Sequence, residues 1–210
     1  MPAAETNMDR REHVKDEIVL GVLDVVEKDA AVTQRSVANE LGIAVGLANA
    51  YLRRCIRKGL IRVRQIPPRR YTYYLTPQGF AEKSRLTASY LAHSFAFFRR
   101  ARSQCAALFA EAVARGQRRL ALIGDGDLAE IASLVVREFP LEIVGVIAAT
   151  ADREVLKAES NALGEVDAVL LTTLVNPRET YEAAIEVFGS RCVHAPALLR
   201  VGPAVPEEAR

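Results

Sequence analysis

The chain has 210 residues, of which half are hydrophobic, and a formal net charge of +2 at pH 7. That length accommodates one large domain or two small ones, and the apolar content is sufficient for packed cores. No apolar run reaches the roughly 18 residues of a membrane helix, and the first residues lack the apolar centre of a signal peptide. Three widely spaced cysteines without a C-x-x-C pair predict neither a disulfide framework nor a zinc site. We therefore expect a protein of the reducing cytoplasm.

The net charge conceals a difference between the two halves of the chain. Residues 1–100 carry 17 Lys and Arg against 10 Asp and Glu, a net charge of +7. Residues 101–210 carry 11 against 16, a net charge of −5. This asymmetry indicates two modules, of which only the first is suited to nucleic acid.

The first predicted helix covers residues 12–28, after a polar stretch at 1–11 that we expect to be disordered. A second helix begins after Thr33, whose hydroxyl can cap it, and ends at Gly42, where a left-handed backbone is free of strain. Apolar residues then resume at helical spacing: Ile43, Ala48, Leu52, Cys55 and Ile56. The pattern predicts a helix-turn-helix.

The second helix of this pair begins a run of positive charge. Residues 53–70 contain eight basic side chains and no acidic one. They are Arg53, Arg54, Arg57, Lys58, Arg62, Arg64, Arg69 and Arg70. Because the same helix presents small or polar residues (Gly46, Asn49 and Ala50), it is suited to a phosphate backbone and a major groove. The alternative is an ordinary helical hairpin with a basic rim.

Beyond these helices the apolar period changes to two. Residues 60–66 and 71–75 read as two antiparallel strands, and Pro67-Pro68 forms the tip between them. Three helices followed by such a hairpin predict a winged helix. Arg69 and Arg70 at the tip would reach a flanking minor groove or its phosphates.

A long helix is predicted from Pro77, with Thr76 as its cap, to about residue 115. At about 1.5 Å per residue it would extend roughly 57 Å, too far to be covered by a small winged helix. An apolar residue recurs along it at every seventh position: Leu91, Phe98, Cys105 and Ala112. This heptad stripe favours a partner helix from a second copy of the chain. The alternative is packing against the C-terminal half of the same chain.

The N-terminal half resembles a known family. The segments T-Q-R-S-V-A-N-E-L-G-I-A-V-G-L-A-N and L-T-P-Q-G-F-A-E-K-S-R-L-T-A-S-Y-L are similar to MarR-type winged-helix regulators that accompany exopolysaccharide gene clusters. The resemblance, over about residues 12–110, implies a small dimeric DNA-binding protein whose subunits join through the helix after L-T-P-x-G. Leu47 and Ala50 depart from the polar or larger residues expected at their positions. The predicted DNA-binding residues are Thr33, Gln34, Arg35, Val45, Gly46, Asn49, Ala50, Arg53, Arg54, Arg64, Arg69 and Arg70.

The C-terminal half has the alternation of a parallel α/β sheet. Strands are expected at residues 118–123, 143–147, 168–171 and 191–193, with helices after residue 126 and at 177–188. The first strand leads into Gly124-Asp125-Gly126-Asp127-Leu128-Ala129, a G-x-G-x-x-A loop between strand and helix. Such a loop is typical of a dinucleotide or nucleotide site. The candidate cofactor residues are Gly124, Asp125, Gly126, Asp127, Leu128, Thr150, Thr172 and Thr173.

The nucleotide fingerprint is incomplete. The second strand ends Ile147-Ala148 without the carboxylate that would bind a ribose, and Asp125 and Asp127 oppose a pyrophosphate electrostatically. Two alternatives therefore remain open. The domain binds a nucleotide, a nucleotide sugar or NAD, or it keeps a nucleotide fold only as a scaffold. This half is similar to small Rossmann-like domains of nucleotide-sugar enzymes and of some methyltransferases. The order of domains is also similar to that of Rex redox-sensing repressors. Against that resemblance, this chain lacks the second-strand carboxylate, has the L-T-P-x-G helix and has no long swapping helix at its C-terminus.

Together these features predict a two-domain α/β protein. The expected divisions are a disordered tail (1–11), a winged helix (12–76), a dimerisation helix (77–115), a Rossmann-like domain (116–196) and a C-terminal tail (197–210). The predicted function is a homodimeric, non-enzymatic transcriptional regulator that binds double-stranded DNA and carries a candidate sensor for a small molecule. No Ser/His/Asp, Cys/His or metal cluster supports catalysis. The alternatives are a Rex-like NAD(H) sensor and a structural assembly module.

Overall fold

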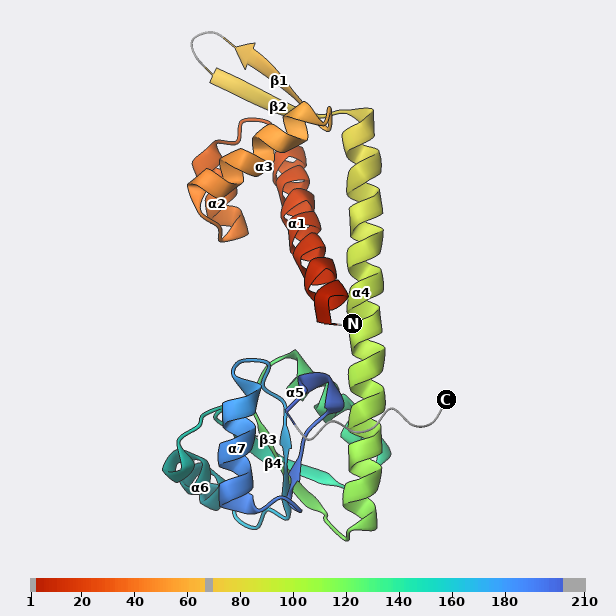
Figure 1. Ribbon diagram of the computed structural model, residues 1–210, viewed down its shortest axis with the longest axis vertical. Helices are drawn as coiled ribbons and strands as arrows, with labels where there is room; N and C mark the ends of the chain where they lie inside the picture. The colour runs from red at the N-terminus through yellow and green to blue at the C-terminus, as the bar shows by residue number, and fades with distance from the viewer. Residues whose placement is uncertain (1–2, 67–69, 202–210) are drawn as a thin grey trace. The chain divides into compact units, whose positions relative to one another are not determined.

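A computed structural model of the chain describes residues 3–66 and 70–201 (Figure 1). The chain forms two compact units, Met1–Ser94 and Phe95–Arg210, which divide within the helix α4 (Pro77–Ala114). Each unit has a hydrophobic core of its own. The predicted fold, a winged helix followed by a long helix and a parallel α/β domain, is confirmed.

The first unit is helical with one hairpin. It contains α1 (Ala3–Lys28), α2 (Gln34–Leu41), α3 (Val45–Arg57), β1 (Ile61–Ile66), β2 (Arg70–Leu75) and the first part of α4. Its core includes Val22, Leu23 and Leu52, each at most 2% exposed. α1 begins at Ala3, whereas the sequence predicted a disordered stretch before residue 12. That prediction is wrong for the backbone of residues 3–11, where the chain is helical and no glycine or proline interrupts it.

A capping box fixes the start of α2. The Ser36 amide donates to Thr33 Oγ1 at 3.1 Å, and the Thr33 amide donates to Ser36 Oγ at 2.8 Å. Gly42 ends the helix at φ 62°, a left-handed conformation that a side chain would strain. These local devices set the turn between α2 and α3, and both were predicted from the sequence.

The hairpin is an antiparallel pair in which Ile61 faces Leu75 and Arg64 faces Thr72. The amide of Tyr73 donates to the carbonyl of Ala30 at 2.8 Å, so the segment between α1 and α2 also pairs with β2. The hairpin is therefore anchored to the helical core. Its predicted tip, Pro67-Pro68 with Arg69, lies outside the described residues.

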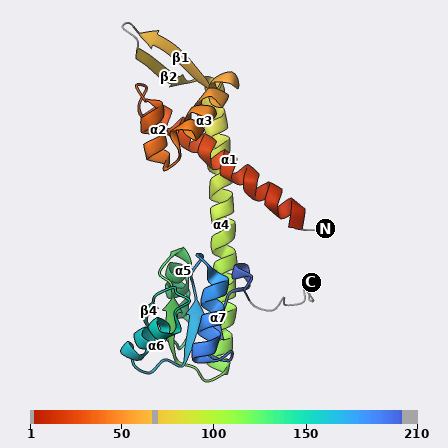
Figure 2. The same cartoon turned by 60° about the vertical axis from the view of Figure 1, so that its left-hand side comes forward.

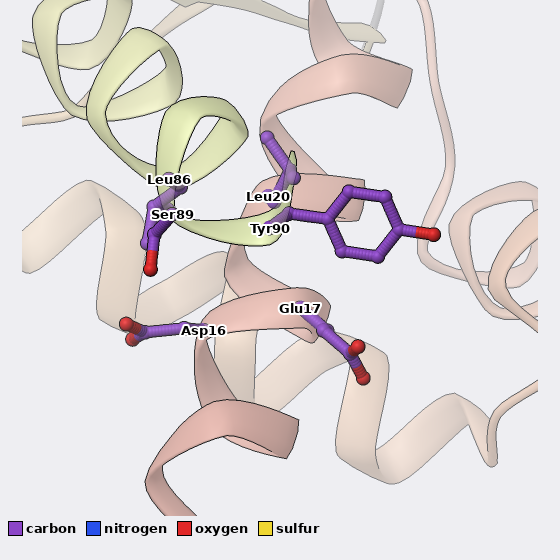
Figure 3. Close-up of a pocket in the computed structure, with 6 residues that line it drawn as sticks. All are labelled: Asp16, Glu17, Leu20, Leu86, Ser89 and Tyr90. Carbon is purple, nitrogen blue, oxygen red and sulfur yellow. The ribbon is translucent and has the colours of Figure 1, made fainter. Parts of the chain in front are cut away.

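The first part of α4 is fixed to α1 by ion pairs. Lys83 Nζ lies 2.6 Å from Asp24 Oδ1 and also contacts Glu27, and Arg85 lies 3.8 Å from Asp16. Leu86 completes the contact in the core. The gap between the two helices, shown in Figure 3, has a volume of about 10 Å³, barely enough for one water molecule. This junction is a packed joint and not a ligand site.

The second unit is a three-layer α/β domain (Figure 2). Its four parallel strands have the order β4-β3-β5-β6. They are β3 (Arg119–Ile123), β4 (Glu142–Ile147), β5 (Ala168–Leu171) and β6 (Val193–His194). The other elements are α5 (Asp127–Val135), η1 (Val136–Glu138), α6 (Arg153–Ala162), α7 (Pro177–Phe188) and η2 (Ala197–Leu199). The sequence prediction lacked α6, although Asp152 caps it by accepting from the amides of Glu154 and Val155.

The last part of α4 belongs to the core of the α/β domain. Cys105, Phe109 and Ala112 are fully buried there, and the Phe109 ring packs on Phe139 with centroids 5.8 Å apart. The predicted heptad stripe therefore divides. Its second half covers the sheet of its own chain, whereas Leu91 and Phe98 are 45% and 40% exposed. An apolar stripe on a helix does not determine what packs against it. Here the α/β domain of the same chain packs against the second half of the stripe only.

The fold of the second unit continues past the predicted domain end at residue 196. Leu199 is buried in the core, and the Leu198 amide donates to Gln104 Oε1 on α4 at 2.8 Å. The predicted tail from residue 197 is thus wrong for 197–201. Two leucines in succession supply the apolar contacts that hold this segment.

Candidate nucleic-acid interface

The exposed face of α3 carries small and basic side chains. Its central line is Gly46, Ala50, Arg53 and Arg57, at spacings of four, three and four residues. The opposite face is buried through Ala48, Leu52 and Cys55. A hollow of about 580 Å³ follows the exposed line and is bordered by Asn49 and Ile56. Four of the predicted DNA-binding residues, Gly46, Asn49, Ala50 and Arg53, therefore lie together on one surface.

The arginines of this surface are directed to solvent. Arg53, Arg54 and Arg57 of α3 are exposed, as are Arg62 and Arg64 of β1. Among the described residues, none of these five makes an ion pair with a carboxylate. Their charge is consequently available to an external anion.

The acidic residue beside this surface is already engaged. The Glu82 carboxylate on α4 accepts from Arg85 at 2.9 Å, which lowers the pKa of Glu82 together with the nearby charge of Lys58. Glu82 therefore partners Arg85 first, and the arginines of α3 and β1 stay without a carboxylate.

The outer face of the hairpin also carries exposed basic side chains. Arg62 pairs in register with Tyr74, and Arg64 with Thr72, whose hydroxyl donates to the Arg64 carbonyl at 3.2 Å. Since residues i and i+2 of a strand share a face, the two arginines project on the same side. Of the two predicted tip residues, Arg69 lies outside the described residues, and only the backbone of Arg70 is described.

The start of α2 holds three of the predicted DNA-binding residues. Thr33, Gln34 and Arg35 are all exposed, but the Thr33 hydroxyl is committed to the capping box with Ser36. Within the described part of the chain, the side chains of Gln34 and Arg35 have no hydrogen-bond or ion-pair partner.

Asn49 lies differently from the expectation of a free base-reading amide. Its Oδ1 atom is buried and has no hydrogen-bond partner among the described residues. A bidentate contact to adenine needs both the oxygen and the nitrogen of the amide to face the base. In this rotamer Asn49 cannot make that contact.

In the α/β domain, the predicted cofactor loop joins β3 to α5. Gly124 has φ +99°, and an added Cβ would lie 2.9 Å from the Thr173 side chain and 3.0 Å from its backbone. This glycine is thus required by contact between two loops of the protein itself. Gly126, the N-cap of α5, has nothing within 4 Å of such a Cβ and faces open space.

The hydroxyls predicted to bind a cofactor are used within the domain. Thr172 Oγ1 donates to the carbonyls of Ile123 and Gly124, at 2.9 and 2.5 Å. Thr173 bonds both the amide and the carbonyl of Val175, and Thr150 accepts from the Asp152 amide at 3.0 Å. These side chains position loops at the carboxyl end of the sheet.

The remaining predicted cofactor residues divide by exposure. Leu128 is fully buried in the core, whereas Asp125 and Asp127 are exposed at the start of α5. At the end of β4, the Ala148 amide donates to Glu159 Oε2 of α6 at 2.6 Å. Glu159 therefore brings a carboxylate to the strand end where the sequence showed none, and it could not be assigned there without α6.

The described residues contain no cluster of three or more His, Cys, Asp or Glu side chains that could hold a metal ion. Nor do they include a helix of sufficient length and apolarity to cross a membrane.

Comparison with known proteins identifies the first unit. Residues 15–62 match a family model described as winged helix-turn-helix DNA-binding. The N-terminal unit is a winged-helix domain. The match covers less than half of the chain. No curated protein matches the chain.

A solved structure described as "PigF with SAH" is similar at 14% sequence identity, over 86% of this chain and 72% of that one. Its TM-score is 0.24, too low to support an inference about this chain.

The winged-helix assignment implies binding to double-stranded DNA and points to residues that the sequence prediction did not select. Arg57 lies on the central line of α3, and Arg62 shares the outer hairpin face with Arg64. Leu47, at 42% exposed, lies on the same flank of α3 as Arg54, two turns earlier. Helical and strand periodicity, applied to the basic run, would have found both arginines.

Proposed function

We propose that the protein is a cytoplasmic, sequence-specific transcriptional regulator that binds double-stranded DNA as a dimer and is not an enzyme. The observation that carries this proposal is the basic surface of the winged helix. Five arginines on α3 and β1 are exposed without a carboxylate partner among the described residues. Unpaired arginines bind DNA phosphates and release the counterions condensed on them, which raises the affinity for DNA. Arginines already paired with carboxylates of the protein would raise it little.

Binding can be tested by fluorescence anisotropy with a labelled 30-base-pair duplex of random sequence and the full chain. We expect saturable binding that weakens steeply between 50 and 200 mM salt. Selection from the random pool should then enrich a defined sequence. A structural assembly module would show neither result, and that outcome would overturn the regulator proposal.

Dimerisation is proposed through the exposed stripe of α4, formed by Leu91, Phe95 and Phe98. Their exposed fractions are 45%, 57% and 40%, and the spacing of four and three residues places them on one helix face. A second copy is the natural occupant, because a symmetric pair of winged helices reads two half-sites.

Native mass spectrometry tests the dimer. The Leu91→Ser/Phe95→Ser variant should be monomeric, and its fold should persist because both side chains are already exposed. Phe80→Ser, which changes an aromatic residue 47% exposed in the first turn of α4, is the matched control and should leave the dimer intact. A dimer that survives the double substitution would contradict this interface.

The α/β domain is proposed as a sensor for a nucleotide or nucleotide sugar. Support comes from the order of its strands, which reverses between β3 and β5, the position where such sheets bind ligands. A Rex-like NAD(H) sensor is the second candidate, and Glu159 at the end of β4 is the carboxylate available to it. Native mass spectrometry of the purified protein would detect a retained small molecule, and titration with NADH or a nucleotide sugar would separate the two.

A further inference from the structure

Three apolar side chains interrupt the basic surface at the start of α3. Val45 and Leu47 are 44% and 42% exposed, and Ala50 is exposed on the central line one turn further along. With Gly46 between them, the first two turns present no hydrogen-bonding side chain at the centre of the exposed face. In a winged helix this is the part of the helix that enters the major groove.

The polar alternative is weak at this end of the helix. Asn49 lies on the same flank as Val45. Its Oδ1 is buried without a hydrogen-bond partner in the described part of the chain, so in this rotamer it cannot make the bidentate contact to adenine. The charged residues begin at Arg53, two turns after Val45. Direct hydrogen bonding to bases from the first two turns is therefore poor.

The major groove offers an apolar side chain one kind of apolar partner. Thymine presents its C5-methyl group there, whereas the edges of the other bases carry hydrogen-bond donors and acceptors. An apolar side chain placed over those edges removes their water without replacing the hydrogen bonds, which is unfavourable. Placed against a methyl group, the same side chain gains from burial.

We propose that Val45, Leu47 and Ala50 make α3 a reader of thymine methyl groups, so that specificity depends on thymines at fixed positions of each half-site. Gly46 assists by letting the helix backbone approach the groove, since it adds no side chain and nothing lies within 4 Å of its Cβ position. The flanking arginines supply affinity through phosphates and leave the sequence preference to the apolar residues. This inference rests on the proposed DNA-binding function.

Replacing thymine by deoxyuridine tests the idea directly, because it removes only the methyl group and preserves base pairing. A duplex enriched by selection is prepared with uracil at each thymine in turn, and its affinity for the full chain is measured by anisotropy. We expect about a fourfold loss at each contacted position, the effect of one buried methyl group, and no loss at other positions.

Variants of the protein test whether α3 causes the loss of affinity for the uracil duplexes. In Leu47→Ala, the difference between thymine and uracil should vanish at one position of each half-site, whereas it should persist in the matched control Leu134→Ala. Leu134 is 56% exposed on α5 of the α/β domain. Arg64→Ala should weaken binding to both duplexes by the same factor.

The outcomes separate this inference from the function on which it rests. A chain that prefers its selected duplex over random DNA but binds the uracil and thymine versions equally would overturn methyl reading and leave the regulator proposal in place. A chain that binds neither duplex would overturn both.

Discussion

Replacing Arg53 and Arg57 with alanine is the sharpest test of the basic surface. Both side chains lie on the central line of α3, are exposed and make no ion pair with a described residue. Alanine is also the best helix former, so the variant should fold as well as the original. Any change in binding is then an effect on the contact with DNA.

The magnitude follows from counterion release. Each phosphate contact contributes about 0.9 to the slope of log K against log salt, so losing two contacts should reduce the slope by about 1.8. Between 50 and 200 mM salt, the affinity of the variant should therefore fall about 12-fold less than that of the original. Anisotropy titrations on one duplex at four salt concentrations measure both slopes.

A charge-matched control separates a local from a global effect. Arg137→Ala/Lys157→Ala removes two exposed basic side chains from the α/β domain and changes the net charge equally. Its slope should be unchanged. If the two double variants lose the same slope, or if Arg53→Ala/Arg57→Ala loses none, the exposed face of α3 is not the phosphate-binding surface.

Three further predictions concern stability. Thr33→Ala should destabilise the winged helix by about 1 kcal/mol in urea unfolding, because it removes the cap of α2, whereas Ser84→Ala on the exposed face of α4 should not. Gly124→Ala should destabilise the α/β domain by about 3 kcal/mol, through a positive φ and a clash with Thr173, and Gly126→Ala should be close to neutral; equal melting temperatures would refute this. Burial lowers the pKa of His194 in the folded chain, the charge of Arg115 lowers it further, and Glu111 partly opposes both. As pH falls below about 6.5, this histidine is therefore protonated in the unfolded chain before it is protonated in the folded one. The stability contributed by neutral His194 is complete above that pH and lost below it, so the melting temperature should drop more between pH 7.5 and 5.5 than it does in His194→Gln.

Much of the winged helix could be predicted because its signals are local. Thr33, Gly42 and the alternation of β1 each determine structure within a few residues, and the structure has each of them as predicted. The orientation of Asn49 could not be predicted, because the burial of one atom of its amide depends on neighbouring elements and not on spacing along the helix.

The long helix shows the limit of periodicity. Leu91, Phe98, Cys105 and Ala112 form one heptad pattern in the sequence, yet the last two are buried in the α/β domain and the first two are exposed. Hydrophobic spacing reports that a face must be covered. It does not say whether the cover comes from the same chain or from another.

The glycine loop of the α/β domain shows how one sequence pattern can serve two physical needs. G-x-G-x-x-A predicted a phosphate site because glycine permits a close approach to an anion. Gly124 instead permits the close approach of Thr173, and the Thr172 hydroxyl donates to the carbonyl of Gly124. Packing within the domain therefore explains why the first position of the motif is glycine. Gly126 has no such internal reason, since its Cβ position is open. If the loop binds an anion, Gly126→Ala should remove binding at unchanged stability. Loss of anion binding without loss of stability in Gly126→Ala would identify a ligand site. The presence of the motif alone does not, because a glycine can also be needed for packing within the domain.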